Sequence, residues 1–227
     1  QPIFKIASGD NNYFKLINEV ASYKLPVIVS TGLLIESEII SFYDNWQRKW
    51  PDVPLGIAHC CASYPVPDKD LNLRVIPQLI SKLENATIGF SDHSLGLTAS
   101  QVAVALGAKF IEKHFTLDHY HSDFRDHQLS ANPKQMKDLV YFIRQIEMML
   151  GKSERDTIHS EKETLIFARR SAVAATNIEV GTILSDEMIK WKRPQDGVKP
   201  SDYHLLVGRK VNKKIDYDDP IKFDDIR

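Results

Sequence analysis

The stretch TIGFSDHSLGLTASQVAVALGAKFIEKHF (residues 87–115) holds two short apolar runs on either side of a helical pattern. The runs TIGFS (87–91) and KFIEKHF (109–115) are typical of buried parallel strands, because they are short and rich in apolar residues. The intervening LTASQVAVALGA is almost wholly apolar and closes at Gly107, a residue type favoured at helix C-termini. Strand, helix and strand in this order predict a βα unit of a parallel sheet.

The same alternation continues towards the N-terminus. Three further strand-like runs are IFKIA (3–7), PVIVS (26–30) and LGIAHC (55–60), each followed by a helical pattern. Five such units are compatible with an open doubly wound sheet or with part of a (β/α)8 barrel. No Gly-x-Gly-x-x-Gly motif follows any of these runs, which removes the main support for a dinucleotide-binding sheet.

Polar clusters at the C-terminal ends of the runs favour the barrel, because that edge carries the catalytic groups in barrel enzymes. The clusters are Ser8-Gly9-Asp10, Ser30-Thr31-Gly32, His59-Cys60-Cys61, Ser91-Asp92-His93 and His114. Five strands do not close a barrel of eight. We therefore expect an α/β fold in which only about the last five βα units are present and about three are absent before them.

Three regions of different character follow one another along the chain. Residues 1–151 carry the βα units, and the polar stretch KSERDTIHSEKET that follows has no strong periodicity. We expect a linker over 152–168 and a small β-rich domain over 169–227, with alternating runs around a turn at Gly181. A domain of that size has a small core, so we expect it to lean on a barrel or on a partner chain.

Composition excludes several classes of protein. The 227 residues are 43% hydrophobic and 26% charged, as in folded proteins with a core. With 29 basic and 30 acidic residues the net charge is −1, so we expect no nucleic-acid or membrane partner. No apolar run approaches the roughly 20 residues of a membrane span. Cys60 and Cys61 are adjacent and poorly placed to bridge each other, which favours a reducing, cytoplasmic location.

Two histidines stand out by their position. His93 ends one predicted strand and His114 ends the next, so their imidazoles are expected close together at the barrel mouth. Such a pair is able to hold a divalent ion while positions stay open for water and substrate. Hydrogen bonding at the two strand ends is the alternative role.

Other side chains at this edge suit anions. Lys5 either points into the mouth as a partner for phosphate or carboxylate, or faces outward from its strand. Three hydroxyls at one rim are able to hold a phosphate, although serine is also common at strand ends: Ser8, Ser30 and Ser91. Three carboxylate candidates stand at the same rim, where most aspartates cap loops: Asp10, Asp92 and Asp126.

Six segments of the barrel portion follow one another as KIASGDNN, PVIVSTG, AHCCASYPVP, GFSDHSLG, ALGAKFIEKHFTLD and DHQLSANP. In this order they resemble the sialic acid synthase family. The tail RRSAVAATNIEVGTILSDEMIKWKRPQDGVKP is similar to that family's C-terminal antifreeze-like (SAF) domain. The resemblance covers essentially the whole chain. It implies that the family's N-terminal third, with the first barrel strands, lies outside it.

The resemblance implies an enzyme that condenses phosphoenolpyruvate with an N-acylated hexosamine, such as N-acetylmannosamine, and releases phosphate. It implies that Mn²⁺, or a similar divalent metal, is held by His93 and His114 and activates the sugar aldehyde. The positions that it implies to be catalytic are Lys5, Asp10, His93 and His114. Those that match ligands of phosphoenolpyruvate are Lys5, Ser8, Ser30 and Ser91.

The resemblance also implies contacts to the sugar and between subunits. Tyr64 and Asp126 match sugar-contacting positions, and Asp10 stands where the family usually has glutamate. Arg193, in KRPQDG, matches an arginine that the SAF domain of one subunit inserts into its partner's barrel, so a domain-exchanged homodimer is expected. The loop FTLDHYHSDFRDHQLS departs from the usual family pattern, which leaves sialic, legionaminic, pseudaminic and spore-coat acceptors open.

Two other functions compete with this one. A different phosphoenolpyruvate-condensing barrel, of the octulosonate-phosphate type, would share the site, but the SAF-like tail argues against it. An inactive carbohydrate-binding or assembly module is the other, because a barrel without its first strands would lack part of the family's catalytic groups.

Overall fold

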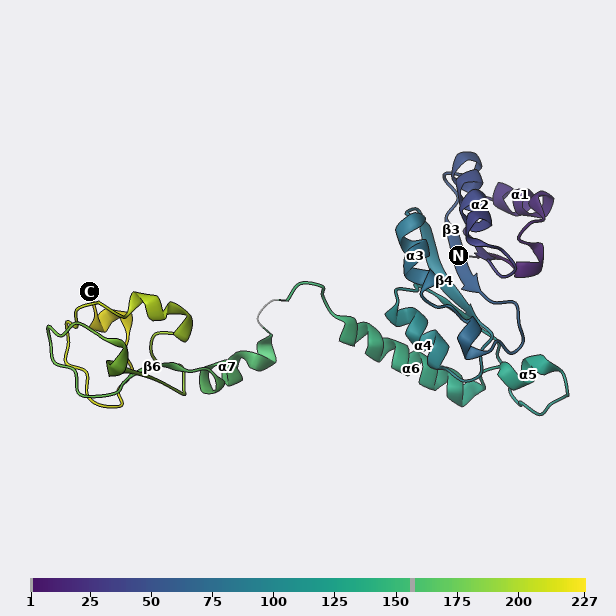
Figure 1. Cartoon of the computed structure of the whole chain (residues 1–227). Helices are drawn as coiled ribbons and strands as arrows, with labels where there is room; N and C mark the ends of the chain where they lie inside the picture. Colours follow the sequence, from purple (N-terminus) through teal and green to yellow (C-terminus); the bar gives the residue numbers. More distant parts are fainter. Residues whose placement is uncertain (1, 156–157) are drawn as a thin grey trace. The chain divides into compact units, whose positions relative to one another are not determined.

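The computed structural model describes residues 2–155 and 158–227. The chain divides into two compact units, Gln1–Gly151 and Lys152–Arg227, each with a hydrophobic core of its own. The first unit is built on a curled parallel sheet that carries helices, and the second on short antiparallel pairings (Figure 1).

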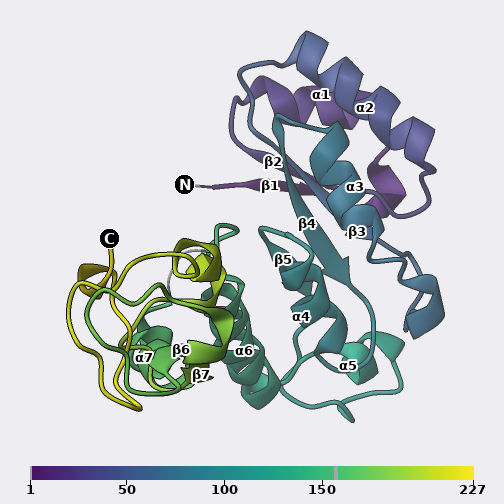
Figure 2. The ribbon, with the colours of Figure 1, turned by 60° about the vertical axis from the view of Figure 1, so that its left-hand side comes forward.

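The sheet of the first unit has five parallel strands in sequence order, with a crossover helix between successive strands (Figure 2). They are β1 (Phe4–Ile6), β2 (Val27–Ser30), β3 (Leu55–Cys60), β4 (Ala86–Asp92) and β5 (Ile111–Lys113). Neighbouring parallel strands joined in this order are the arrangement of a (β/α) barrel, which confirms the predicted fold class. Within residues 2–155, β1 and β5 each pair with one strand only, so this part of the barrel is open.

Helices cover the sheet between the strands. They are α1 (Phe14–Ser22), α2 (Glu36–Lys49), α3 (Val75–Lys82), α4 (Thr98–Ala105), α5 (Arg125–Leu129) and α6 (Pro133–Leu150). The longest, α6, begins where the sequence places a strong start signal. The side chain of Asn132 accepts from the Gln135 N–H, and the Gln135 side chain accepts from the Asn132 N–H, while Pro133 occupies the first turn. Single 3₁₀ turns are η1 (Ser8–Asp10) and η2 (Asp68–Asp70).

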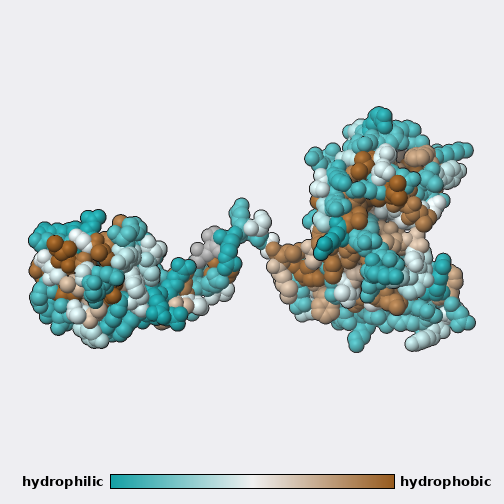
Figure 3. Space-filling model, in the orientation of Figure 1, coloured by the Kyte–Doolittle hydropathy of each residue, from teal (hydrophilic) through white to brown (hydrophobic). Residues whose placement is uncertain are grey.

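The core of the first unit lies between the sheet and its helices. Every residue of β3 is buried, as expected of a central parallel strand covered on both faces. The largest fully buried side chains there are Ile57, Ile76, Leu79, Leu83, Ile88 and Phe90. Hydrophobic residues are also exposed on the face of this unit that Figure 3 shows. Several of the exposed residues of this unit have large apolar side chains.

One aromatic ring packs directly against the backbone of two neighbouring strands. Phe110 packs against Gly56 of β3 and Gly89 of β4, two residues that have no side chain of their own to fill this space. A Cβ atom built on Gly89 would stand 2.5 Å from three atoms of the ring. The two glycines therefore make the space that the ring occupies.

We expect Gly89→Ala to lower the free energy of unfolding by about 1–3 kcal/mol, because the Phe110 ring and the strand backbone must move apart. Gly9→Ala is the matched control, since a Cβ added there meets open space among the described residues. Urea unfolding of the two variants checks this. Equal stability of both would show that the ring adapts without cost.

The second unit is a small β-rich domain, as predicted. Its elements are η3 (His159–Glu161), α7 (Lys162–Ala168), β6 (Ser171–Ala174), η4 (Asp186–Met188), β7 (Ile189–Lys192), η5 (Pro200–Leu205) and η6 (Phe223–Asp225). Strands β6 and β7 are antiparallel, and single bridges such as Ile178 with Ile215 extend the pairing. Leu206 and Ile221 are fully buried at its centre.

The segment predicted as a linker contains a helix. Helix α7 lies within residues 152–168, and all seven of its side chains are exposed. Its apolar residues, 165–168, are consecutive and do not recur every three or four positions, so sequence periodicity gives no signal for a helix. Across the described ranges, every helix is too short or too polar to cross a membrane.

Candidate functional site

A cavity of about 340 Å³ lies at the C-terminal ends of the strands. Seven of the ten side chains predicted for the site line it, and these are Lys5, Ser8, Ser30, Tyr64, Ser91, His93 and His114. A larger cavity of about 700 Å³ shares Cys60 with it, but is lined by other residues of β2, β3, α2 and α3. The smaller cavity is therefore the candidate functional site, because most of the predicted site residues line it.

Strand pairing sets the order of side chains across the cavity. Cys60 of β3 is the register partner of Ser91 in β4, and Ser91 is the partner of Glu112 in β5. Side chains that are register partners in a parallel sheet point to the same face. A thiol, a hydroxyl and a carboxylate thus form one row, which we call the floor row.

The two histidines meet above the floor row. The ring centroids of His93 and His114 are 5.1 Å apart with planes at 69°, and the ring of Tyr64 lies 4.2 Å from His93 and 5.9 Å from His114. His93 is buried and His114 is half-buried. The two strand ends therefore hold their imidazoles together, as the spacing predicts.

The two histidines differ electrostatically. Burial lowers the pKa of His93, but hydrogen bonds with Cys60 and the Cys61 carbonyl outweigh it, so that pKa is raised above its ordinary value. Burial and the neighbouring His93 lower the pKa of His114. His114 is therefore the more readily neutral of the two at pH 7.

The donor set fits an open metal site. Nδ1 of His93 donates to the carbonyl of Cys61 at 3.0 Å, so the proton is held on Nδ1 and Nε2 keeps its lone pair. Nδ1 of His114 lies 3.7 Å from a carboxylate oxygen of Asp126. Backbone carbonyls and carboxylates on the second ring nitrogen are the usual partners of metal-binding histidines. Among the described residues no group of three or more histidine, cysteine or carboxylate side chains is arranged to hold a metal ion, so the pair offers two imidazole ligands.

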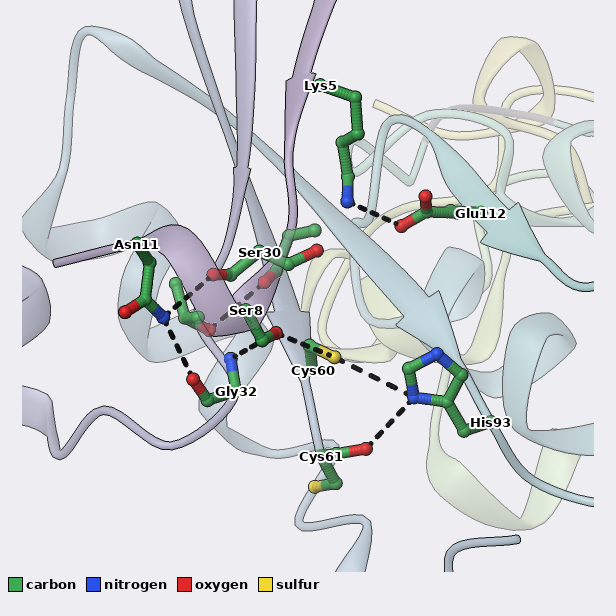
Figure 4. A network of polar contacts seen from close by, with 11 residues as sticks. Lys5, Ser8, Asn11, Ser30, Gly32, Cys60, Cys61, His93 and Glu112 are labelled. Atoms are coloured by element: carbon green, nitrogen blue, oxygen red, sulfur yellow. Dashed lines mark hydrogen bonds and ion pairs between the residues drawn. The ribbon is translucent and has the colours of Figure 1, made fainter. Parts of the chain in front are cut away.

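Cys60 connects the histidines to the serine side of the cavity (Figure 4). The hydroxyl of Ser8 donates to its Sγ at 3.5 Å, and Nδ1 of His93 lies 3.8 Å from the same sulfur. Burial raises the pKa of Cys60, but the bonds with His93 and Ser8 outweigh it and lower that pKa below its ordinary value. Cys60 is not among the predicted site residues, because a buried cysteine at a strand end is usually inert packing.

Lys5 points into the cavity, where its Nζ lies 3.0 Å from Oε2 of Glu112 (Figure 4). This resolves the two orientations left open for Lys5. Glu112 was not among the predicted site residues. Its signal is present, because alternation along KFIEKHF places it on the same face as His114.

The hydroxyl group of Ser30 is buried and is available to bond with a ligand. Ser30 is 2% exposed, and its Oγ has no hydrogen-bond partner among the described residues. Its carbonyl and that of Gly32 accept from the side-chain amide of Asn11, which fixes the loop after β2. A buried hydroxyl without a partner is costly unless a ligand or water satisfies it.

Three predicted site residues lie outside the cavity lining. Asp10 is exposed in η1, and Asp126 lies on α5 beside His114. Arg193 is exposed and follows β7 in the second unit, so it belongs to a different compact unit from the cavity.

The curled parallel sheet and the cavity at its carboxyl edge define a protein of the (β/α)-barrel class. The chain belongs to the NeuB family, whose model matches residues 1–155, and a SAF domain model matches residues 169–227. This confirms the resemblance to sialic acid synthases.

Similar proteins cover almost the whole chain. Uncharacterized protein MJ1065 of Methanocaldococcus jannaschii is 42% identical over 99% of this chain and 66% of its own length. Pseudaminic acid synthase of Campylobacter jejuni (serotype O:23/36) is 37% identical over 99% of this chain and 64% of its own. The crystal structure of spore coat polysaccharide biosynthesis protein E from Chromobacterium violaceum superposes with a TM-score of 0.81 at 27% identity, over 99% of this chain and 67% of that one. The chain thus spans slightly less than two thirds of the curated relatives.

Proposed function

We propose that the protein is a nonulosonic acid synthase, which condenses phosphoenolpyruvate with an N-acylated hexosamine and releases phosphate. The observation that carries this proposal is the histidine pair, 5.1 Å apart, facing one cavity with a lysine and three serine hydroxyls. Family membership and the pseudaminic acid synthase relative support the same class of reaction.

Phosphoenolpyruvate is expected on the serine side of the cavity. Lys5 supplies a cation for its phosphate or carboxylate, and an incoming anion would compete with Glu112 for that cation. Ser30 Oγ, which has no partner in the described ranges, is available to donate to the same anion. The remaining hydroxyls are those of Ser8 and Ser91.

The histidine side is expected to hold the divalent ion, with Mn²⁺ as the proposed metal. His93 and His114 are its protein ligands, and Nε2 of His93 is left free for it by the bond from Nδ1 to Cys61. When bound, such an ion polarises the aldehyde oxygen of the open-chain sugar. Asp126 lies 3.7 Å from Nδ1 of His114, near enough to favour its charged form but too far for a hydrogen bond.

In the proposed reaction, C3 of phosphoenolpyruvate forms a bond to the aldehyde carbon, and water adds at C2. The C2–O bond then breaks and phosphate leaves with the bridging oxygen. The chain's contribution is to hold the two substrates in one cavity, which removes much of the entropic barrier. Tyr64, next to both histidines, is placed to contact the sugar, and Asp10 is proposed to act near it.

Arg193 is proposed to act in a domain-exchanged homodimer, in which it reads the N-acyl group of the sugar bound by the partner. It is exposed and in the SAF unit, as that role requires. The acceptor belongs to the N-acyl amino sugars of the sialic, legionaminic, pseudaminic or spore-coat types.

Calorimetric titration with Mn²⁺ tests the proposal. We expect saturable binding of one ion by the intact protein and loss of that binding in His93→Ala, because one of two protein ligands is removed. His159→Ala, at an exposed histidine of the second unit, is the matched control and should bind like the unaltered protein. Unchanged binding in His93→Ala would refute the assignment.

A further inference from the structure

A buried ion pair lies directly behind the two histidines. Nζ of Lys113 is 3.1 Å from Oδ2 of Asp92, and their side chains are 1% and 0% exposed. Asp92 precedes His93 in the chain and Lys113 precedes His114. The two charged residues are also register partners, at the last pairing between β4 and β5.

The pair is part of a closed hydrogen-bond network. Oδ1 of Asp92 accepts from the N–H (2.8 Å) and the hydroxyl (2.6 Å) of Ser94, and Oδ2 accepts from the hydroxyl of Ser100 in α4 (2.6 Å). Lys113 Nζ also donates to the carbonyl of Ser94 at 2.9 Å. His93 is therefore held from both sides, because its two chain neighbours are bonded to each other and to β5.

Successive side chains of a strand point to opposite faces. The alternation turns the side chain of Asp92 towards Ser100 of α4 and away from the face that carries Ser91 and His93. Lys113 is among the residues that line the cavity, but its side chain is 1% exposed and its ammonium group is bonded to Asp92 and to the Ser94 carbonyl. The network thus lies mainly behind the cavity wall, next to the two histidines.

Stability alone does not account for such a pair. Removing two charges from water costs several kcal/mol per ion, and well-packed apolar residues at such a place are often equally stable. Buried ionic groups are best attested where they fix one arrangement of elements. Here the Asp92–Lys113 pair fixes the register and the spacing of the C-terminal ends of β4 and β5.

We propose that the Asp92–Lys113 pair positions His93 and His114, by locking the ends of β4 and β5 at the separation that lets both imidazoles bind one ion. The inference rests on the proposed metal site and goes beyond it, because it assigns a role to two residues outside the proposed metal ligands and substrate-binding side chains. Asp92 and Lys113 are positioning residues.

The test compares single and double variants of the intact protein. Asp92→Asn or Lys113→Met leaves the other charge buried without its partner, so each single variant should unfold more easily. The double variant Asp92→Asn, Lys113→Met removes both charges with little change of shape, so its thermal midpoint should recover. Its affinity for Mn²⁺ should nevertheless stay lowered about 10–100-fold, the range seen when outer-shell partners of a metal site are changed.

The matched control is the exposed pair Lys214–Asp216 in the second unit, neutralised as Lys214→Met, Asp216→Asn. It should leave Mn²⁺ affinity unchanged. Recovery of Mn²⁺ affinity together with stability in the Asp92→Asn, Lys113→Met variant would show a purely structural pair and overturn the inference.

Crystal structures of the unaltered and double-variant proteins give a readout that needs no metal. We expect the two imidazoles to separate or turn by about 1 Å or more in the variant. Rings that keep their 5.1 Å spacing would overturn the inference even where the protein binds Mn²⁺. Rings that move in a protein that binds no Mn²⁺ would refute the proposed metal site and leave the positioning role standing.

Discussion

His114→Ala is expected to lower turnover of phosphoenolpyruvate and sugar by about 1,000-fold or more. A metal acting on a carbonyl oxygen is worth several kcal/mol, and each 1.36 kcal/mol of activation free energy is a factor of about ten. With one of the two proposed protein ligands gone, the ion would no longer be fixed beside the sugar. Phosphate release, measured at saturating concentrations of both substrates, gives the rate.

Comparing turnover with the thermal midpoint of unfolding distinguishes a catalytic role of His114 from a role in the stability of the fold. His114 is half-buried at the cavity edge, so its loss should leave the thermal midpoint almost unchanged. His159→Ala, which removes the same atoms from an exposed site, should keep full activity. A His114→Ala protein that still turns over at a tenth of the normal rate would contradict the role given to this ring.

Phe90→Ala is expected to lower the free energy of unfolding of the first unit by about 3–5 kcal/mol. Phe90 is 0% exposed in the middle of the sheet, and its ring stacks on that of His59 with centroids 6.0 Å apart. The truncation leaves a cavity that strands β3 and β4 cannot close without losing their pairing. Denaturant unfolding followed by tryptophan fluorescence in a Trp191→Phe background measures the change, since Trp46 and Trp50 lie in this unit and Trp191 in the second.

Leu206→Ala is the matched control for Phe90→Ala. Leu206 is also 0% exposed but belongs to the separate core of the second unit. Its loss should destabilise that unit by about 2–5 kcal/mol and leave the transition of the first unit in place. A Phe90→Ala protein within 1 kcal/mol of the unaltered one would show that Phe90 is not central to the first core.

Much of the first unit is predictable because its strands are short, apolar and followed by polar residues. The run LGIAHC coincides with β3, and TIGFS and PVIVS fall within a residue of β4 and β2. KFIEKHF is longer than β5, because pairing with β4 stops after Lys113. The histidine pair follows from the same reasoning, since both residues end adjacent strands.

Contacts that depend on register and on the opposite sheet face are beyond sequence patterns. Cys60 joins the floor row through the register of β3 and β4. The alternation along KFIEKHF places Glu112 on the face of His114, but its pairing with Lys5 depends on the fold. The Asp92–Lys113 pair is hidden for a related reason, since a charged residue in a short strand is ordinarily expected at the surface. Helix α7 is not predicted because its apolar residues, 165–168, are consecutive and do not recur every three or four positions.

Because the floor row depends on strand register, a shift of one residue between neighbouring strands would change which side chains face the cavity. If β4 moved by one residue against β5, the alternation would put Asp92 in the place of Ser91 and turn His93 towards the helices. The buried charges would then face the cavity, and the imidazoles would lie on opposite sides of the sheet. Folding to the wrong alignment would therefore yield a compact protein in which the proposed metal site is not assembled, and the number of Mn²⁺ ions bound per molecule would report the fraction of a preparation with correctly paired strands.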